Sequence, residues 1–134
     1  MFDPFMSHLA PYRPHLLSIL RIVTALLFLE HATVKLFGFP VTDAPSAAAL
    51  TFFWWIGVLE LVGSVLLVIG WWTRLAAFVL SGEMAVAYFM AHAPHSFFPI
   101  QNGGEAAILF CFIFLYIAAA GPGAWAIDSR AKSS

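Results

Sequence analysis

Four long apolar stretches limit what this chain can fold into more than any other feature of its sequence. Each is close to the roughly 20 residues that a helix needs to cross the hydrocarbon core of a bilayer. They cover residues 14–37, 48–69, 72–93 and 104–120, with glycine or proline at or near most of their ends. Little of the chain is left for loops, so the sequence predicts a single transmembrane domain over residues 1–134.

The composition excludes the main alternative, a water-soluble protein with a very large core. Of the 134 residues, 62% are hydrophobic and 10% are charged, whereas about a quarter are charged in ordinary soluble domains. A soluble domain of this length buries only about two-thirds of its surface, too little to hide so many apolar side chains. The alternation typical of membrane β-barrels is absent from the sequence. The predicted fold class is therefore all-α, an integral membrane antiparallel four-helix bundle.

The charges give no reason to expect nucleic acid as a partner. The net charge is -1 and the basic residues are scattered along the chain. The single cysteine, Cys111, lies in an apolar stretch and cannot form a disulfide or a CxxC pair within the chain. Any redox chemistry therefore requires a bound cofactor or a partner protein.

Basic residues near the ends of the apolar stretches predict the orientation, because cytoplasmic loops carry an excess of Lys and Arg. Five basic residues are expected on one side of the membrane: Arg13, Arg21, Arg74, Arg130 and Lys132. Arg21 lies within the first stretch, but its long side chain can snorkel to that side. The opposite side has Lys35 alone. The sequence thus predicts a multi-pass protein with both termini in the cytoplasm.

One glutamate in each apolar stretch is the main functional signal: Glu30, Glu60, Glu83 and Glu105. An ionised side chain at the centre of a membrane helix costs about 2.5 to 3.5 kcal/mol. We therefore expect these acids to turn inward and converge within the bundle. Helical rise places Glu60 and Glu83 roughly 15 Å below the outer face. Glu30, Glu60 and Glu83 are the candidate catalytic, proton-carrying residues.

Other side chains at similar depths complete a candidate ligand site. His31 and Lys35 are possible hydrogen-bond donors, and Tyr88 is a possible aromatic wall. In the last stretch, helical spacing aligns Glu105, Leu109, Phe112 and Tyr116 on one face. The candidate ligand-binding residues are His31, Lys35, Tyr88, His92, Glu105 and Phe112.

Other interpretations of these residues remain open. A buried glutamate could pair with a basic residue of another helix only to hold the helices in register. His31 and His92 could in principle ligate a b-type haem, although their depths differ by several residues. A metal site of His92, His95 and Glu105 is conceivable, but the spacing is generic. We expect neither haem nor metal.

Three segments carry a family resemblance: RIVTALLFLEHATVKLFGFP, GVLELVGSVLLVIGWWTRLAAFVLSGEMAVAYFMAH, and GGEAAILF with the closing GPGAWAIDS. With these segments the chain resembles the DoxX family of small bacterial and archaeal membrane proteins, from about Arg21 to Ser129. The most specific parts include Lys35 with Gly38, and Glu60 followed by Gly63. One departure is Ala32, which stands where the family commonly has glycine after the first-helix histidine.

The resemblance implies a four-helix protein of the bacterial inner (plasma) membrane. Members of the family are associated with quinone-linked oxidation, as in the membrane part of a thiosulfate:quinone oxidoreductase. They are also associated with membrane complexes tied to thiol and superoxide stress. The resemblance therefore implies quinone as the cofactor to test first.

Together, the residues and the resemblance favour a redox-linked subunit that binds a quinone or similar small apolar ligand near a buried Glu, His and Lys cluster. Its electron donor is expected to be a soluble oxidoreductase, since the chain has no GxGxxG or phosphate-binding motif for flavin or nicotinamide. The alternative is a non-catalytic role. The chain could anchor a soluble enzyme to the membrane, or transport protons or solutes as a homo-oligomer.

Overall fold

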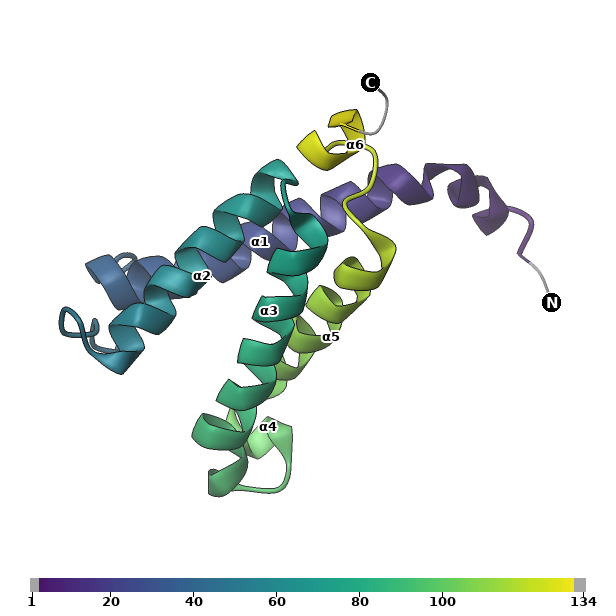
Figure 1. Ribbon diagram of the computed structural model, residues 1–134. Coiled ribbons are helices and arrows are strands. Elements are labelled where there is room, and N and C mark those ends of the chain that lie inside the picture. The colour runs from purple at the N-terminus through teal and green to yellow at the C-terminus, as the bar shows by residue number, and fades with distance from the viewer. Residues whose placement is uncertain (1–2, 132–134) are drawn as a thin grey trace.

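The computed structural model describes residues 3–131, and its regular structure consists of helices (Figure 1). No β-strand occurs within those residues. The helical elements, in chain order, are η1 (Met6–Tyr12), α1 (Arg13–Phe37), α2 (Phe52–Ile69), α3 (Thr73–Ala87), η2 (Tyr88–His92), η3 (Ala93–His95), α4 (Pro99–Asn102), α5 (Glu105–Ala120) and α6 (Ile127–Ala131). The predicted all-α class is confirmed.

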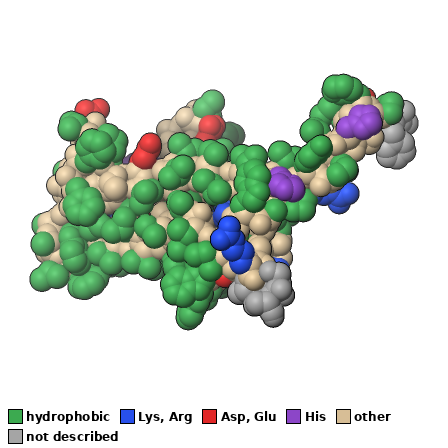
Figure 2. Space-filling view, turned by 90° about the horizontal axis from the view of Figure 1, so that it is seen from above, with side chains coloured by type: hydrophobic (Ala, Val, Ile, Leu, Met, Phe, Trp, Pro, Cys, Tyr) green, Lys and Arg blue, Asp and Glu red, His purple; other side chains and the backbone are tan. Residues whose placement is uncertain are grey.

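Among the described residues, three continuous helical segments are long and apolar enough to cross a membrane: Met6–Phe37, Phe52–Ile69 and Thr73–His95. The fourth apolar helix, α5, has 16 residues and is about 24 Å long. Many large hydrophobic side chains point outward, and Figure 2 shows them spread over the visible face among a few charged groups. This surface suits lipid rather than water, so the protein is a membrane protein.

The helices begin and end at residues that the sequence marks. Pro14 lies in the first turn of α1, where its missing N–H costs nothing. Gly38 and Gly70 end α1 and α2 with φ values of 64° and 71°, in the left-handed region that favours glycine. The second helix was expected from residue 48 but begins at Phe52. The left-handed φ of 67° at Leu50 explains the difference, because a helix cannot continue through it.

The long helices form two antiparallel hairpins, α1 with α2 and α3 with α5. The hairpins meet near α6 and diverge towards their other ends (Figure 1). Gly63 lets α2 and α3 approach closely, since a Cβ there would lie 2.9 Å from a Leu80 methyl carbon. Fully buried aromatic and aliphatic side chains fill the junction: Phe28, Leu67, Leu80, Phe114 and Ile117.

Arg21 ties the C-terminal segment to this junction. It was expected to snorkel to the membrane surface, but its side chain is fully buried. The guanidinium donates to the backbone carbonyls of Leu67 at 2.8 Å and Trp125 at 2.6 Å, and also to that of Pro122. The expectation was wrong because segment 121–126 folds back over α1 and brings carbonyl acceptors to the arginine.

Asp128 fixes the same segment to the turn between α2 and α3. Its carboxylate accepts hydrogen bonds from the backbone N–H groups of Trp72 (3.1 Å) and Thr73 (2.9 Å), at the start of α3. Partial burial alone would raise the pKa of Asp128, but the hydrogen bonds from Thr73 and Trp72 outweigh it and hold the pKa below its usual range. The carboxylate therefore caps a helix from a distant part of the chain.

We predict that Asp128→Asn lowers the free energy of unfolding by about 1 kcal/mol, since the start of α3 loses a charged cap. Because the pKa of Asp128 is lower in the folded protein, its stabilising effect is complete above the ordinary value of 3.8. The effect then fades as the pH falls through the folded-state value. The measurement is the unfolding of wild type and Asp128→Asn in detergent at several acidic pH values. A difference in their free energies of unfolding that stays constant with pH would contradict the prediction.

Arg21→Met removes one donor from each of three carbonyls, of which that of Pro122 keeps the Ser18 hydroxyl, so segment 121–131 should detach more often. We predict that trypsin then cleaves after Arg130 more than about tenfold faster. The measurement is mass spectrometry of the products released over time from protein in detergent. Arg13→Met is the control, because Arg13 is an exposed arginine of the same helix. Equal cleavage rates in the two variants would show that Arg21 does not hold the segment.

Candidate functional site

A cavity of about 480 Å³ lies between the diverging hairpins, lined by residues of α1, α2, α3, η2 and α5. Five of its lining residues are polar or charged: His31, Lys35, Glu60, Glu83 and His92. All the others are apolar side chains or glycine. The cavity therefore combines an apolar wall with a small set of ionisable groups, the usual make-up of a small-molecule site.

An ion pair between Lys35 and Glu60 forms the centre of the polar wall. The Lys35 ammonium donates to both carboxylate oxygens of Glu60 at 2.7 Å. Glu60 is fully buried, while 29% of the Lys35 side chain is exposed. Gly57, one turn before Glu60, permits the contact because α1 crosses directly against it: a Cβ there would lie 3.1 Å from the Lys35 Cβ. The carboxylate is thus charged, buried and paired across two helices.

Glu83 of α3 adds a second carboxyl group to this pair. It lines the same cavity, and its Oε2 is buried without a hydrogen-bond partner among the described residues. A buried polar atom without a partner is costly, so this oxygen is available to a ligand in the cavity. Three ionisable groups from three helices therefore line one cavity.

An aromatic ring of α5 also lines the cavity and packs on neighbouring rings. Phe110 of α5 lines the cavity, and its ring centroid lies 5.7 Å from that of His31 and 5.2 Å from that of Phe28. Phe112 had been expected in this role, but it is outside the cavity and 64% exposed. Two positions on a helix differ by about 200°, so the two phenylalanines face opposite ways. The alanines at 106 and 107 could have indicated the cavity face of α5.

His92 reaches the cavity from η2, a π-helical turn, a feature often found at functional sites. Its Nδ1 lies 3.0 Å from the backbone oxygen of Asn102, so Nδ1 carries the proton. The Asn102 side chain donates to the Tyr88 hydroxyl at 3.2 Å and to the Ser96 carbonyl. Tyr88 thus supports the loop below the cavity but does not line it. Asn102 had not been singled out in the sequence.

The expected convergence of the acids holds for Glu60 and Glu83 alone. Glu30 is exposed and lines a different pocket of about 680 Å³, between the end of α1 and the loop of residues 38–51. The two pockets share His31, Lys35 and Phe53. Glu105 is exposed in the first turn of α5, where a negative charge favours the helix. Within residues 3–131, no group of three His, Cys, Asp or Glu side chains could hold a metal ion.

Comparison with known proteins identifies relatives of the chain. The model of the DoxX family matches residues 16–93, which include Lys35, Glu60, Glu83 and His92. An uncharacterized protein of Haemophilus influenzae (strain ATCC 51907 / DSM 11121 / KW20 / Rd) is 46% identical over 130 residues, covering 93% of this chain and 97% of its own length. No solved structure shows significant similarity to the chain.

Breaking the buried ion pair from one side should be costlier than removing it altogether. We predict that Lys35→Met lowers the free energy of unfolding by about 2 kcal/mol, because it leaves the Glu60 charge buried without a partner. The double variant Lys35→Met, Glu60→Met should recover most of that loss. Unfolding in detergent compares the stability of wild type, Lys35→Met, Glu60→Met and the double variant. A double variant less stable than either single variant would show that the two residues contribute separately.

Proposed function

Because the chain belongs to the DoxX family, we propose that it is a membrane subunit that binds a quinone between its two hairpins. The observation that carries the proposal is a set of ionisable residues, including the buried Lys35 and Glu60 pair and Glu83, that lines a mostly apolar cavity. Ionisable residues within membrane helices are costly and usually serve a function. Binding of a ligand that needs both an apolar wall and a proton is one function that explains why these ionisable residues are kept in membrane helices.

The dimensions and chemistry of the cavity support this ligand. Its volume of about 480 Å³ lies in the range of small-molecule sites, which is roughly 300 to 1,000 Å³. It holds a substituted ring and the first carbons of a tail. Phe110 and Met90 supply an apolar wall for such a ring. The Lys35 ammonium, which keeps a third N–H beyond its two bonds to Glu60, is the donor for a ring carbonyl.

Proton handling is the role we assign to the two acids. A quinone takes up two electrons and two protons when it is reduced to the quinol. We propose that Glu60 and Glu83 share one proton and pass it to a ligand oxygen at the cavity wall. The second proton follows after water from the open side of the cavity has reprotonated the two acids. The electrons must come from a partner, for which we propose a soluble oxidoreductase.

The arrangement in the membrane follows from the basic residues. We propose that α5 completes a four-span antiparallel unit in the inner membrane, with both termini in the cytoplasm. Arg13, Arg74 and Arg130 lie towards the α6 end of the molecule, and Lys35 towards the other. Lys132, which also supported this orientation, lies outside the described residues. The site then opens in the half of the membrane away from the cytoplasm.

The proposal predicts that the protein in detergent binds a short-tailed ubiquinone or menaquinone analogue. Ala106→Phe should weaken binding at least about tenfold, because Ala106 is exposed to the cavity and the added ring fills it without touching the charged cluster. Leu109→Phe is the matched control, since Leu109 lies on the same helix outside the cavity. Quenching of tryptophan fluorescence by the analogue measures binding.

The alternative, a non-catalytic membrane anchor, gives a different result. In that case neither variant changes binding, and any uptake of the analogue matches its partition into empty detergent micelles. Binding that is equal in wild type, Ala106→Phe and Leu109→Phe would contradict the proposed function.

A further inference from the structure

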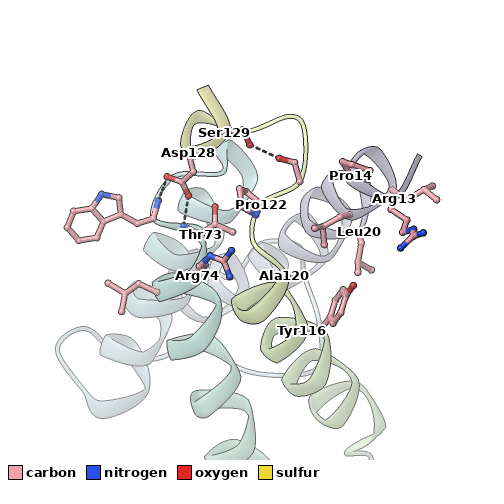
Figure 3. Close-up of a pocket in the computed structure, with 15 residues that line it drawn as sticks. Arg13, Pro14, Leu20, Thr73, Arg74, Tyr116, Ala120, Pro122, Asp128 and Ser129 are labelled. Carbon is pink, nitrogen blue, oxygen red and sulfur yellow. Dashed lines mark hydrogen bonds between the residues drawn. The ribbon is translucent and has the colours of Figure 1, made fainter. Parts of the chain in front are cut away.

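A larger groove lies at the opposite end of the molecule, beside α6 (Figure 3). It has a volume of about 1220 Å³ and lies between the start of α1, the start of α3, the end of α5 and residues 122–129. It shares no lining residue with the quinone cavity. The function proposed above therefore does not account for it.

The floor of the groove is apolar and open to the outside. Leu16, Leu20 and Leu75 line it with exposed fractions of 46%, 37% and 57%. Tyr116 lies at its lower edge in Figure 3 and is also exposed. Because these side chains belong to membrane-length or apolar helices, the groove continues into the lipid-facing surface. A ligand here can keep an apolar portion in the membrane.

Two arginines line the groove from opposite sides, Arg13 on α1 and Arg74 on α3 (Figure 3). Arg74 uses Nη1 to cap α5 through the carbonyls of Ala118 and Ala119, and Arg13 uses Nε to bind the Ala10 carbonyl at 3.2 Å. Each guanidinium therefore keeps further N–H donors.

The one acid of the groove does not cancel these charges. The Asp128 carboxylate accepts the backbone N–H groups at the start of α3, so its oxygens are already engaged. The lining residues include two arginines and one aspartate, which leaves a net positive charge. Guanidinium groups match the geometry of phosphate oxygens.

We propose that this groove binds an anionic phospholipid, with its phosphate at Arg13 and an acyl chain along Leu16 and Leu20 on the same face of α1, while Arg74 on the opposite side adds to the positive charge. A free phosphate would satisfy the arginines alone, whereas a lipid also covers the apolar floor. This end of the molecule carries most of the arginines, so under the proposed orientation it lies in the cytoplasmic leaflet, where anionic lipids are concentrated. The site itself does not depend on what the other cavity binds.

Native mass spectrometry tests the proposal on delipidated protein in mild detergent, mixed with equal amounts of phosphatidylglycerol and phosphatidylcholine with identical acyl chains. Wild type should retain phosphatidylglycerol in clear excess. Arg13→Gln should lower that excess about fivefold, because one charge at the phosphate is lost. Arg130→Gln is the matched control, since it removes one positive charge from the same end outside the groove and should leave the excess unchanged.

Two results would overturn the proposal. If both variants lower the excess equally, or neither does, the arginines of the groove do not form a specific site.

A second arm adds inorganic phosphate to the same mixture. Displacement of phosphatidylglycerol by phosphate at moderate concentration would show that the groove recognises a soluble anion, whereas unchanged retention supports a lipid held also by its acyl chain.

Discussion

The buried carboxylate of Glu60 is the constraint on which the candidate site depends. A buried charge in a membrane helix must be compensated by an opposite charge or by hydrogen bonds. Both carboxylate oxygens of Glu60 accept hydrogen bonds from the Lys35 ammonium, at 2.7 Å each. That contact joins α1 to α2. Glu83 of α3 lines the same cavity, with one buried oxygen that has no partner among the described residues. The ion pair and Glu83 thus place three ionisable groups, from both hairpins, around one cavity.

Buried polar groups have different partners at the two ends of the molecule. At the α6 end, arginine side chains donate hydrogen bonds to backbone carbonyls. Arg21 donates to the carbonyls of Leu67 and Trp125, and Arg74 donates to carbonyls in the last turn of α5. These bonds close the junction where the hairpins meet. At the other end the hairpins diverge, and the polar groups face a cavity instead of backbone. The fold is therefore tied at one end and accessible at the other.

The sequence predicted the helices and part of the site because both depend on local signals. Apolar length, Pro14 and Gly70 set the helix bounds, and the cost of burying Glu60 and Glu83 required them to face inward. The placement of Phe110 instead of Phe112 depends on which face of α5 meets the other helices, which periodicity alone does not decide. The partners of Arg21 and Asp128 come from contacts more than 45 residues apart in the chain, and no local pattern indicates them.

The central claim is that Glu60 and Glu83 share one proton beside the cavity, and infrared spectroscopy of the protein in lipid measures this most directly. The account predicts the carbonyl stretch of a protonated carboxyl group at neutral pH in wild type. That band should disappear in Glu83→Gln while the Lys35 and Glu60 ion pair remains. A wild-type spectrum at neutral pH that contains only ionised carboxylates would contradict the account.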